Sequence, residues 1–521
     1  MSKSFKKTQI TDQLKSLLLI LTASASIALS GCAVNPVTGK NELSWITTAD
    51  EISIGSQQYL PSQQSQGGQF LADAELNDYI NEVGQRVANA GDRDLPYEFV
   101  VLNNSVPNAW ALPGGKIAVN RGLLLELKDE AELAAVLGHE AVHAAAKHGA
   151  NSLQRSQIMQ GLVTATAIGA STTDYGNYIV GGAQVGAQMI GQKYGRDAEL
   201  ESDYYGIKYM SLAGYDPSAA IGLQQTFVRL SEGQSSSWVD GLFASHPPSQ
   251  SRVDANRRTI SELNLPAGER YQERYKQKVS FLYDNRHAYK KADIAASTED
   301  LTEAQSLINS AIKSVPTEAR FLGLQGNLYF QQKKFNKAKT SFNQALALDD
   351  SYYEYYLGRG LAYQQLGKPQ AATQDLTRSH QLLPTAVSSN ALGRLALAQG
   401  NRSEAKQYFQ MAMGSNSQTS QSATNNFRRL DIPDNPNQYI GVRATTTDDQ
   451  QLVAVLSNKT NINMTDIRMQ VSAQIDGQAL QREFTAKSLN AKGSLSIGTG
   501  WKAASSITNV SIKILNAAVA D

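Results

Sequence analysis

The sequence predicts a multidomain, mainly α-helical protein, and three observations carry this prediction. Helical periodicity with one short β segment extends to about residue 230, a 34-residue period appears between residues 298 and 414, and apolar and polar residues alternate beyond residue 434. A length of 521 residues also suggests about three folded units, at a typical size of roughly 150 residues each. We expect a helical domain with a small β element, an α-solenoid and a β-sandwich-like unit, in that order.

The composition is that of an ordinary globular protein. Charged residues make up 18% of the chain, hydrophobic residues 41%, and the formal net charge is +1. A nucleic-acid-binding protein usually carries a clear excess of lysine and arginine, which is absent here. Nucleic acid is therefore not an expected partner.

The N-terminus has the pattern of an export signal. Several lysines precede an apolar run from Leu17 to Leu29, which is below the roughly 20 residues that cross a bilayer. The only cysteine of the chain, Cys32, follows Ser30 and Gly31, and this arrangement resembles a bacterial lipoprotein processing box. We predict a signal peptide over residues 1–31 and a lipid on Cys32; the alternative is a short N-terminal membrane anchor.

The resemblance to lipoproteins also bears on location. Ala33 follows the modified position, where an aspartate would resemble a signal for retention at the inner membrane. We therefore expect an outer-membrane anchor that faces the periplasm of a Gram-negative bacterium. A lone cysteine forms no internal disulfide, so an oxidising compartment suits the chain. Residues 32–49, with Pro36 and Gly39, are expected to form a polar tether that leaves the lipid some slack.

The first folded domain is predicted over residues 50–265. Its β element consists of residues 97–102 and 116–119, and it precedes a helix over residues 132–148. A second helix, near residues 197–210, opens with acidic side chains that suit a helix N-terminus. The stretch 156–192 is rich in small and apolar residues; we favour tightly packed helices there over a surface that touches a membrane.

The next domain, predicted over residues 266–416, has a repeating sequence. Ala304, Ala338 and Ala372 are each 34 residues apart, and Gly326 and Gly360 keep the same spacing. Small residues in a 34-residue register are typical of tetratricopeptide repeats, in which two helices approach closely. We expect about four helical pairs.

The last unit, predicted over residues 434–521, alternates in the way β-strands do. Examples are the stretches 452–456 and 467–471, and Asp476-Gly477 has the composition of a hairpin turn. A small β-sandwich-like unit fits this pattern. No residue pattern in it indicates chemistry.

The predicted helix over residues 132–148 carries the residues for a metal site. His139 and His143 are four residues apart, so on a helix both project from one face and can share a zinc ion. Glu140 lies between them and flanks the open side of the metal. When it is held by three protein ligands and a water, zinc lowers the pKa of that water toward about 7, and Glu140 can take the proton as the water attacks a peptide carbonyl.

The acidic helix is expected to supply the third ligand. Glu199 and Asp203 are four residues apart and therefore face the same way. We predict that Glu199 binds the metal, that Asp203 accepts a hydrogen bond from a ligating histidine, and that Glu201 points elsewhere. His148, at the end of the first helix, is expected to be a capping residue or a neighbour of a ligand rather than a ligand itself.

Four motifs in order resemble the gluzincin peptidases of the family of HtpX and the CAAX prenyl protease. They are the histidine motif, the block at residues 199–203, the stretch 108–123 and the stretch 245–253. The resemblance implies a zinc-dependent endopeptidase with a zincin-type fold and one Zn2+ per chain. Ser202 stands where the family usually has alanine.

The resemblance also implies roles for further residues. An edge strand would hold an extended substrate by main-chain hydrogen bonds. The strand residues would be Lys116, Ile117, Ala118, Val119 and Asn120. His246 would stabilise the oxyanion, fill the fourth zinc position and keep the enzyme latent, or be structural. Arg252 would pair with a carboxylate of the site or with the oxyanion.

Export, a peptidase domain and repeats together resemble periplasmic members of that family that act in outer-membrane protein quality control. The implied substrates are unfolded or misassembled envelope proteins, and the repeats would dock substrate or the outer-membrane assembly machinery. The competing hypothesis is a scaffold or chaperone in which the repeats act and the zinc site is largely latent. A purely structural zinc is least favoured, because Glu140 has no purpose in a closed site.

Overall fold

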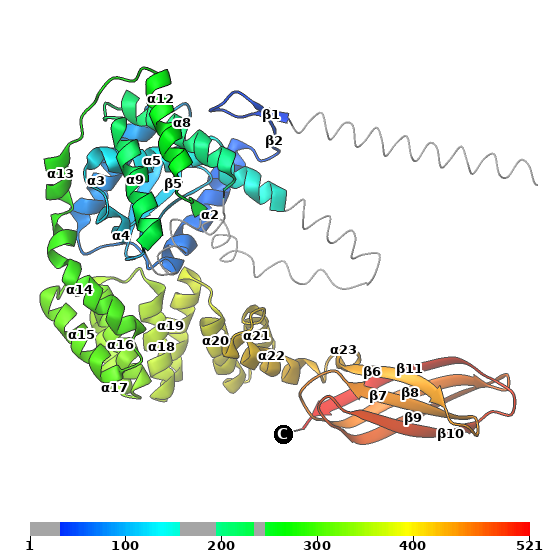
Figure 1. Cartoon of the computed structure of the whole chain (residues 1–521). Coiled ribbons are helices and arrows are strands. Elements are labelled where there is room, and N and C mark those ends of the chain that lie inside the picture. Colours follow the sequence, from blue (N-terminus) through cyan, green and yellow to red (C-terminus); the bar gives the residue numbers. More distant parts are fainter. Residues whose placement is uncertain (1–31, 157–193, 234–244, 521) are drawn as a thin grey trace, which may run out of the picture. The chain divides into compact units, whose positions relative to one another are not determined.

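A computed structural model describes residues 32–156, 194–233 and 245–520 (Figure 1). The predicted signal peptide lies outside the described residues, as does the predicted small-residue stretch apart from residue 156. The chain divides into two compact units, residues 1–362 and 363–521, and each is described by itself. The division does not test the limits of the three folded domains predicted from the sequence, so those limits stay predictions. Among the described helices, none combines the length and hydropathy that a bilayer crossing requires.

A three-stranded sheet forms the β element of the first unit. Its strands are β3 (Glu98–Leu102), β4 (Ala109–Leu112) and β5 (Lys116–Asn120), in the order β3-β5-β4. β5 pairs in parallel with β3 and antiparallel with β4, so it is the central strand. The prediction that residues 116–120 form the substrate edge strand is therefore wrong, because neighbouring strands use the main-chain groups on both sides of β5.

Among the described residues, no strand pairs with the other edge of β4, a strand that the sequence interpretation did not include. The Asn120 N–H donates to the Asn108 carbonyl at 2.8 Å, which makes these two residues a hydrogen-bonded pair. Because such pairs alternate along an antiparallel ladder, the N–H and C=O groups of Ala109 and Ala111 point away from β5. The turn to β5 requires Gly114, whose φ is 77° and where a Cβ would lie 2.6 Å from Ile52 Cα.

The predicted metal helix is α5 (Glu130–Ala145), capped by the Asp129 side chain, and the predicted acidic helix is α8 (Arg196–Leu212). The two helices pack closely because glycines face each other. A Cβ on Gly206 would lie 3.0 Å from the His139 nitrogen, and one on Gly138 would lie 3.1 Å from the Gly206 carbonyl oxygen. This approach brings the acidic side chains of α8 beside the histidines of α5.

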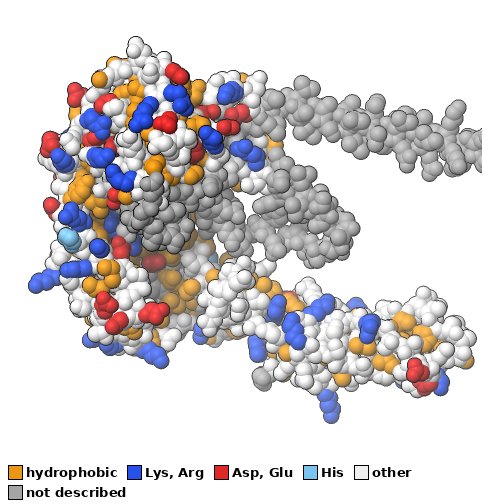
Figure 2. All heavy atoms as spheres, viewed as in Figure 1, with side chains coloured by type: hydrophobic (Ala, Val, Ile, Leu, Met, Phe, Trp, Pro, Cys, Tyr) orange, Lys and Arg blue, Asp and Glu red, His pale blue; other side chains and the backbone are white. Residues whose placement is uncertain are grey.

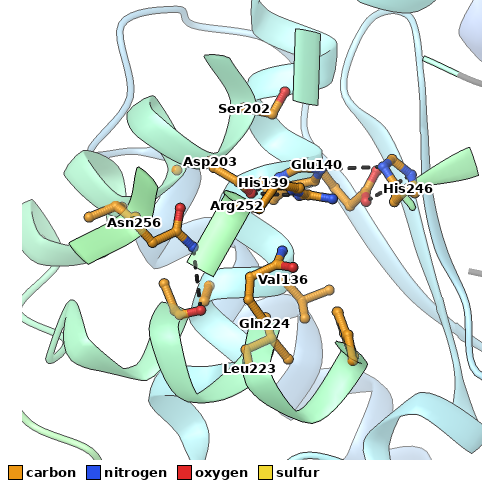
Figure 3. Close-up of a pocket in the computed structure, with 15 residues that line it drawn as sticks. Val136, His139, Glu140, Ser202, Asp203, Leu223, Gln224, His246, Arg252 and Asn256 are labelled. Carbon is orange, nitrogen blue, oxygen red and sulfur yellow. Dashed lines mark hydrogen bonds and ion pairs between the residues drawn. The ribbon is translucent and has the colours of Figure 1, made fainter. Parts of the chain in front are cut away.

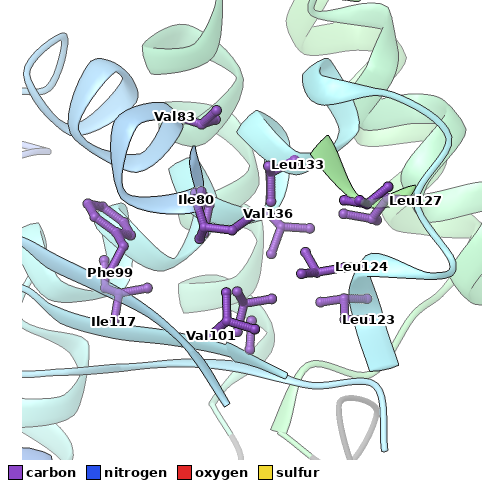
Figure 4. Close-up of a cluster of buried hydrophobic side chains, with 14 of the residues drawn as sticks. Ile80, Val83, Phe99, Val101, Ile117, Leu123, Leu124, Leu127, Leu133 and Val136 are labelled. Atoms are coloured by element: carbon purple, nitrogen blue, oxygen red, sulfur yellow. The ribbon is translucent and has the colours of Figure 1, made fainter. Parts of the chain in front are cut away.

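The hydrophobic core of this unit fixes α5 between the sheet and the surrounding helices (Figure 4). Side chains from the sheet, such as Val101 and Ile117, meet Leu133 and Val136 of α5 and Ile80 of a flanking helix, all of them buried. The flanking helices are α3 (Ala74–Ala88), α4 (Arg121–Leu124), α9 (Ser218–Gly233) and α12 (Gln250–Glu262).

The segment after Cys32 is not a loose tether, which corrects that prediction. β1 (Cys32–Val34) and β2 (Asn41–Leu43) form a hairpin, and α2 (Thr48–Ser65) follows it with a capping box at Thr47. The hairpin and the residues that follow it form hydrogen bonds with residues just beyond the metal helix. Asn151 donates to Glu42 at 2.7 Å, Lys147 to the Ile46 carbonyl at 3.3 Å, and the Trp45 N–H to Gln154 at 3.0 Å.

Helical pairs continue the chain, and the 34-residue period marks them. In the first unit, α13 (Gln272–Lys278) leads into the helices α14 (Ser280–Ser297), α15 (Leu301–Ser314), α16 (Ala319–Gln331) and α17 (Phe335–Leu348). Then come α18 (Tyr353–Gln365), α19 (Pro369–Leu382), α20 (Ala386–Ala398), α21 (Arg402–Met411) and α22 (Gln418–Asp431). The small residues Ala304, Ala338 and Ala372 are fully buried, as their register predicts.

The C-terminal strands form two three-stranded antiparallel sheets, with the orders β10-β7-β6 and β11-β8-β9. After the short α23 (Pro436–Tyr439), the strands are β6 (Ile440–Thr446), β7 (Gln451–Asn458), β8 (Met464–Ile475), β9 (Gln478–Leu489), β10 (Ser494–Lys502) and β11 (Ile507–Val519). One buried cluster takes side chains from both sheets, including Leu456 and Met469. The β-sandwich-like prediction is confirmed.

On the face of the molecule in Figure 2, acidic and basic side chains are interspersed.

Candidate active site

The structure brings four potential metal ligands together. His139 and His143 come from α5, Glu199 from α8, and His246 from the segment that leads into α12. One ligand atom from each lies within 4.8 Å of every other. Three of the four are at least 95% buried, so this is an enclosed site and not a surface cluster.

The spacing of these atoms fits a tetrahedral zinc ion. With Zn–N distances of 2.0–2.1 Å, ligand atoms lie about 3.3–3.4 Å from one another. His139 Nε2 lies 3.0 Å from His143 Nε2 and 3.3 Å from His246 Nδ1. Oε1 of Glu199 lies 3.4 Å from His143 Nε2, and its Oε2 lies 3.6 Å from His139 Nε2. Three imidazoles and one carboxylate are also a donor set that zinc prefers.

The orientation of His139 supports the same conclusion. Its Nδ1 lies 3.0 Å from an oxygen of Asp203, as the spacing of Glu199 and Asp203 predicted. A carboxylate only accepts hydrogen bonds, so Nδ1 carries the proton and the lone pair of Nε2 points at the ligand cluster. Asp203 thus holds His139 in the form that binds a metal.

Arg252, on α12, pairs with the carboxylates of the site. Its Nε and one terminal nitrogen each donate to Asp203 at 2.7 Å, and its other terminal nitrogen lies 2.8 Å from Glu199. Burial would raise the pKa of Asp203, but Arg252 and His139 lower it below its usual range. The pKa of Glu199 is likewise lowered despite burial, chiefly by His246 and the two ligating histidines. Of the two roles predicted for Arg252, this geometry supports pairing with carboxylates.

Glu140 faces the site from the same turn of α5 as His139. Its side chain is 2% exposed, and its Oε1 lies 3.6 Å from Nε2 of His246 (Figure 3). Its other oxygen has no hydrogen-bond partner among the described residues. An unpartnered carboxylate oxygen at an enclosed site is available to accept a proton from water.

An apolar pocket of about 40 Å³ adjoins His139 and Glu140. Figure 3 shows Val136 of α5 and Leu223 of α9 on its lining, with Gln224 and Asn256 as polar neighbours. The pocket lies beside the ligands, where the side chain of a bound peptide has room to enter.

Two contacts at the site were missed by sequence reasoning. Tyr194 stacks on His143, with ring centroids 4.1 Å apart, and burial raises its pKa. Glu201, predicted to point away from the metal, is not among the clustered ligands; it lies 3.2 Å from His148, whose ring in turn contacts His143 at 2.9 Å. Neither contact had a sequence signal, because one tyrosine or one glutamate at these spacings carries no pattern.

Comparison with known proteins agrees with the site. Residues 73–260 match the model for "Peptidase family M48", and residues 326–367 match a model for "TPR repeat". A putative beta-barrel assembly-enhancing protease from Vibrio cholerae is 31% identical over 194 residues, which are 36% of this chain and 40% of that protein. The beta-barrel assembly-enhancing protease of Escherichia coli K12 is 24% identical over 375 residues, 66% of this chain and 76% of that protein.

A eukaryotic protein is also similar to part of this chain. The mitochondrial metalloendopeptidase OMA1 of Schizosaccharomyces pombe is 34% identical over 177 residues, 34% of this chain and half of that protein. The chain thus spans less than two thirds of the Vibrio and yeast relatives and about three quarters of the E. coli relative. Residues 73–260 form a metalloendopeptidase domain of peptidase family M48, carried on the same chain as TPR repeats.

Proposed function

We propose that the protein is a zinc-dependent endopeptidase of the cell envelope that hydrolyses peptide bonds of misfolded or misassembled envelope proteins. The observation that carries the proposal is the convergence of His139, His143 and Glu199 beside a carboxylate, Glu140, with an unpartnered oxygen. A closed structural zinc site has no use for that carboxylate. The similarity to beta-barrel assembly-enhancing proteases supports the envelope as the place of action.

The chemistry divides between the metal and the protein. A bound zinc ion supplies Lewis acidity, which lowers the pKa of water and polarises the peptide carbonyl. Glu140 accepts the proton of the attacking water and delivers it to the leaving amine. Asp203 and Arg252 keep His139 and Glu199 oriented throughout.

We propose that His246 is the fourth ligand in this conformation. Its Nδ1 lies 2.9 Å from Glu199, while its Nε2 faces Glu140. A zinc ion held by four side chains has no position for water, whereas a catalytic zinc needs one. We propose that His246 acts as a latch that must leave before substrate is cleaved.

Casein cleavage by the full chain, purified in detergent, tests the function and the latch together. We expect about one zinc per chain, loss of cleavage on chelation and recovery on zinc addition. His246→Ala should cleave faster than the wild type, because the fourth position is then open to water. The matched control is His287→Ala, at an exposed histidine of α14. Slower cleavage by His246→Ala would contradict the latch and favour a role for His246 on the oxyanion.

We propose that the substrate lies along the edge of β4 that faces away from β5 rather than along residues 116–120. The outward N–H and C=O groups of Ala109 and Ala111 offer main-chain hydrogen bonds, and such bonds read no side chain. This edge would suit unfolded proteins of many sequences.

A scan of N-methylated peptide substrates tests the β4 edge without changing the enzyme. An antiparallel partner presents every second N–H to β4, so methylation at alternate positions should slow cleavage. Each lost hydrogen bond is worth about 0.5–1.5 kcal/mol, which corresponds to about 2- to 12-fold in kcat/KM. Equal effects at successive positions would contradict strand pairing.

We propose that the repeats dock substrate or a partner such as the outer-membrane assembly machinery. A cavity of about 320 Å³ supports this role. The cavity is lined by the end of α2, by the repeat helices α16 and α17, and by residues before and within α18. Its lining includes Arg320, Asn327, Tyr352 and Tyr355. We also propose a periplasmic location with a lipid on Cys32, because the N-terminal sequence resembles that of a lipoprotein.

The alternative function is a repeat-based scaffold or chaperone with a largely latent zinc site. The position of His246 in the ligand cluster is the observation that favours it. Full zinc content without cleavage by the wild type or by His246→Ala would support this alternative.

A further inference from the structure

His148 lies between a metal ligand and a carboxylate. Its Nδ1 is 2.9 Å from Nδ1 of His143, and its Nε2 is 3.2 Å from Oε1 of Glu201. His148 comes just after α5, where Lys147 adopts a left-handed backbone (φ 61°). His148 is 8% exposed, so these contacts form in an enclosed space.

With His148 neutral, the hydrogen bonds of this chain run in one direction. The Glu201 carboxylate only accepts, so Nε2 of His148 donates to it. The other nitrogen of His148 then has a lone pair and accepts from Nδ1 of His143. His143 therefore carries its proton on Nδ1, which leaves the lone pair of Nε2 directed at His139 and Glu199.

The N-terminal hairpin reaches the outer end of the same chain. The side-chain nitrogen of Asn35 lies 3.5 Å from Glu201 Oε1 and 3.4 Å from the Ala146 carbonyl oxygen. Asn35 is 2% exposed, and it is fixed by a 2.9 Å hydrogen bond to Glu42. A residue three positions after Cys32 thus contacts the carboxylate that orients His148.

We propose that His148 and Glu201 are positioning residues for the metal ligand His143, and that Asn35 of the docked hairpin completes this chain. Asp203 does the same for His139, so each ligating histidine of α5 has its own carboxylate, one direct and one through a second histidine. The proposal rests on the proposed metal site and extends it: docking of the N-terminal segment and affinity for the metal are linked.

A pair of His148 variants separates positioning from simple packing. His148→Leu fills the space but offers no acceptor to His143. His148→Gln offers both an acceptor oxygen and a donor nitrogen, so it can replace both hydrogen bonds. If His148 only fills space at the end of α5, leucine should serve as well as glutamine.

The measurement is zinc affinity of the full chain in detergent, by competition with a chelator, together with the visible spectrum of the cobalt-substituted protein. We expect His148→Leu to bind zinc about 10- to 100-fold more weakly, with a changed cobalt spectrum, and His148→Gln to recover most of the affinity. Asn35→Ala should give a smaller loss in the same direction. The matched control is Ser202→Ala, because Ser202 touches the same ring only at 3.4 Å and no step depends on it.

Each outcome has one meaning. Wild-type affinity and spectrum in His148→Leu would overturn the positioning role. If that variant does not fold, Glu201→Leu at the half-buried end of the chain gives the same comparison, and unchanged affinity there would overturn the proposal equally. A wild-type protein that binds no zinc would instead refute the metal site on which the proposal rests.

Discussion

Glu140→Gln should lower the rate of peptide-bond hydrolysis by about 10²- to 10⁴-fold, because the attacking water then has no group to take its proton. Glutamine keeps the size of the side chain but does not accept the proton at neutral pH. Glu140 is not one of the four clustered ligand residues, so the zinc content of Glu140→Gln should equal that of the wild type. Cleavage of casein and metal analysis of the same preparation measure both quantities.

Glu262→Gln is the matched control, because it makes the same chemical change at an exposed residue at the end of α12. It should leave kcat and zinc content unchanged. Retention of full activity by Glu140→Gln would mean that another group is the base. Equal function of wild type and Glu140→Gln in the cell would favour the scaffold hypothesis, even if the purified enzyme is inactive.

The parts of the site that follow from the sequence are those set by helix geometry alone. His139 and His143 share a face because they are four residues apart on α5, and the same spacing places Asp203 beside Glu199 on α8. The close packing of α5 and α8 depends on Gly138 and Gly206, and it turns two local patterns into one cluster. Such periodicities are visible in a sequence.

The order of strands and the long-range contacts are not visible in this way. The sequence predicts β5 as a strand, but its central place depends on β4, whose four residues lie inside a motif that was not predicted as a strand. The contact of Asn35 with Glu201 joins residues 166 positions apart, and no local pattern encodes it. The same is true of the hairpin that replaces the expected tether.

The C-terminal unit lies between these cases. The alternation in β7 and β8 predicts a buried face, and the burial along both strands follows it. Asp476-Gly477 predicts a hairpin, and both residues have the positive φ that such a turn needs, between the paired residues Ile475 and Gln478. Which sheet each strand joins depends on pairing across the unit, and the sequence does not give it.

Arg252→Ala should destabilise the metal-free peptidase domain by about 3–5 kcal/mol, because it removes a buried cation that pairs with two buried carboxylates. Asp203 would lose two charge-assisted hydrogen bonds of 2.7 Å, and Glu199 the positive charge at 2.8 Å. Unfolding of the whole multidomain chain is not two-state, so the loss is better measured locally, by amide hydrogen exchange of peptides from α5 and α8.

Arg257→Ala is the matched control, on the same helix and also paired with a carboxylate, Asp254. Both side chains of that pair are about half exposed, so its loss should cost about 1 kcal/mol or less. Equal effects of the two substitutions would contradict the role of Arg252. Zinc should reduce the effect of Arg252→Ala, because the metal ion supplies a cation to Glu199, whereas Asp203 keeps only its hydrogen bond with His139. The difference between the stability loss without zinc and the smaller loss with zinc would therefore measure how much Arg252 contributes through its pairing with Glu199.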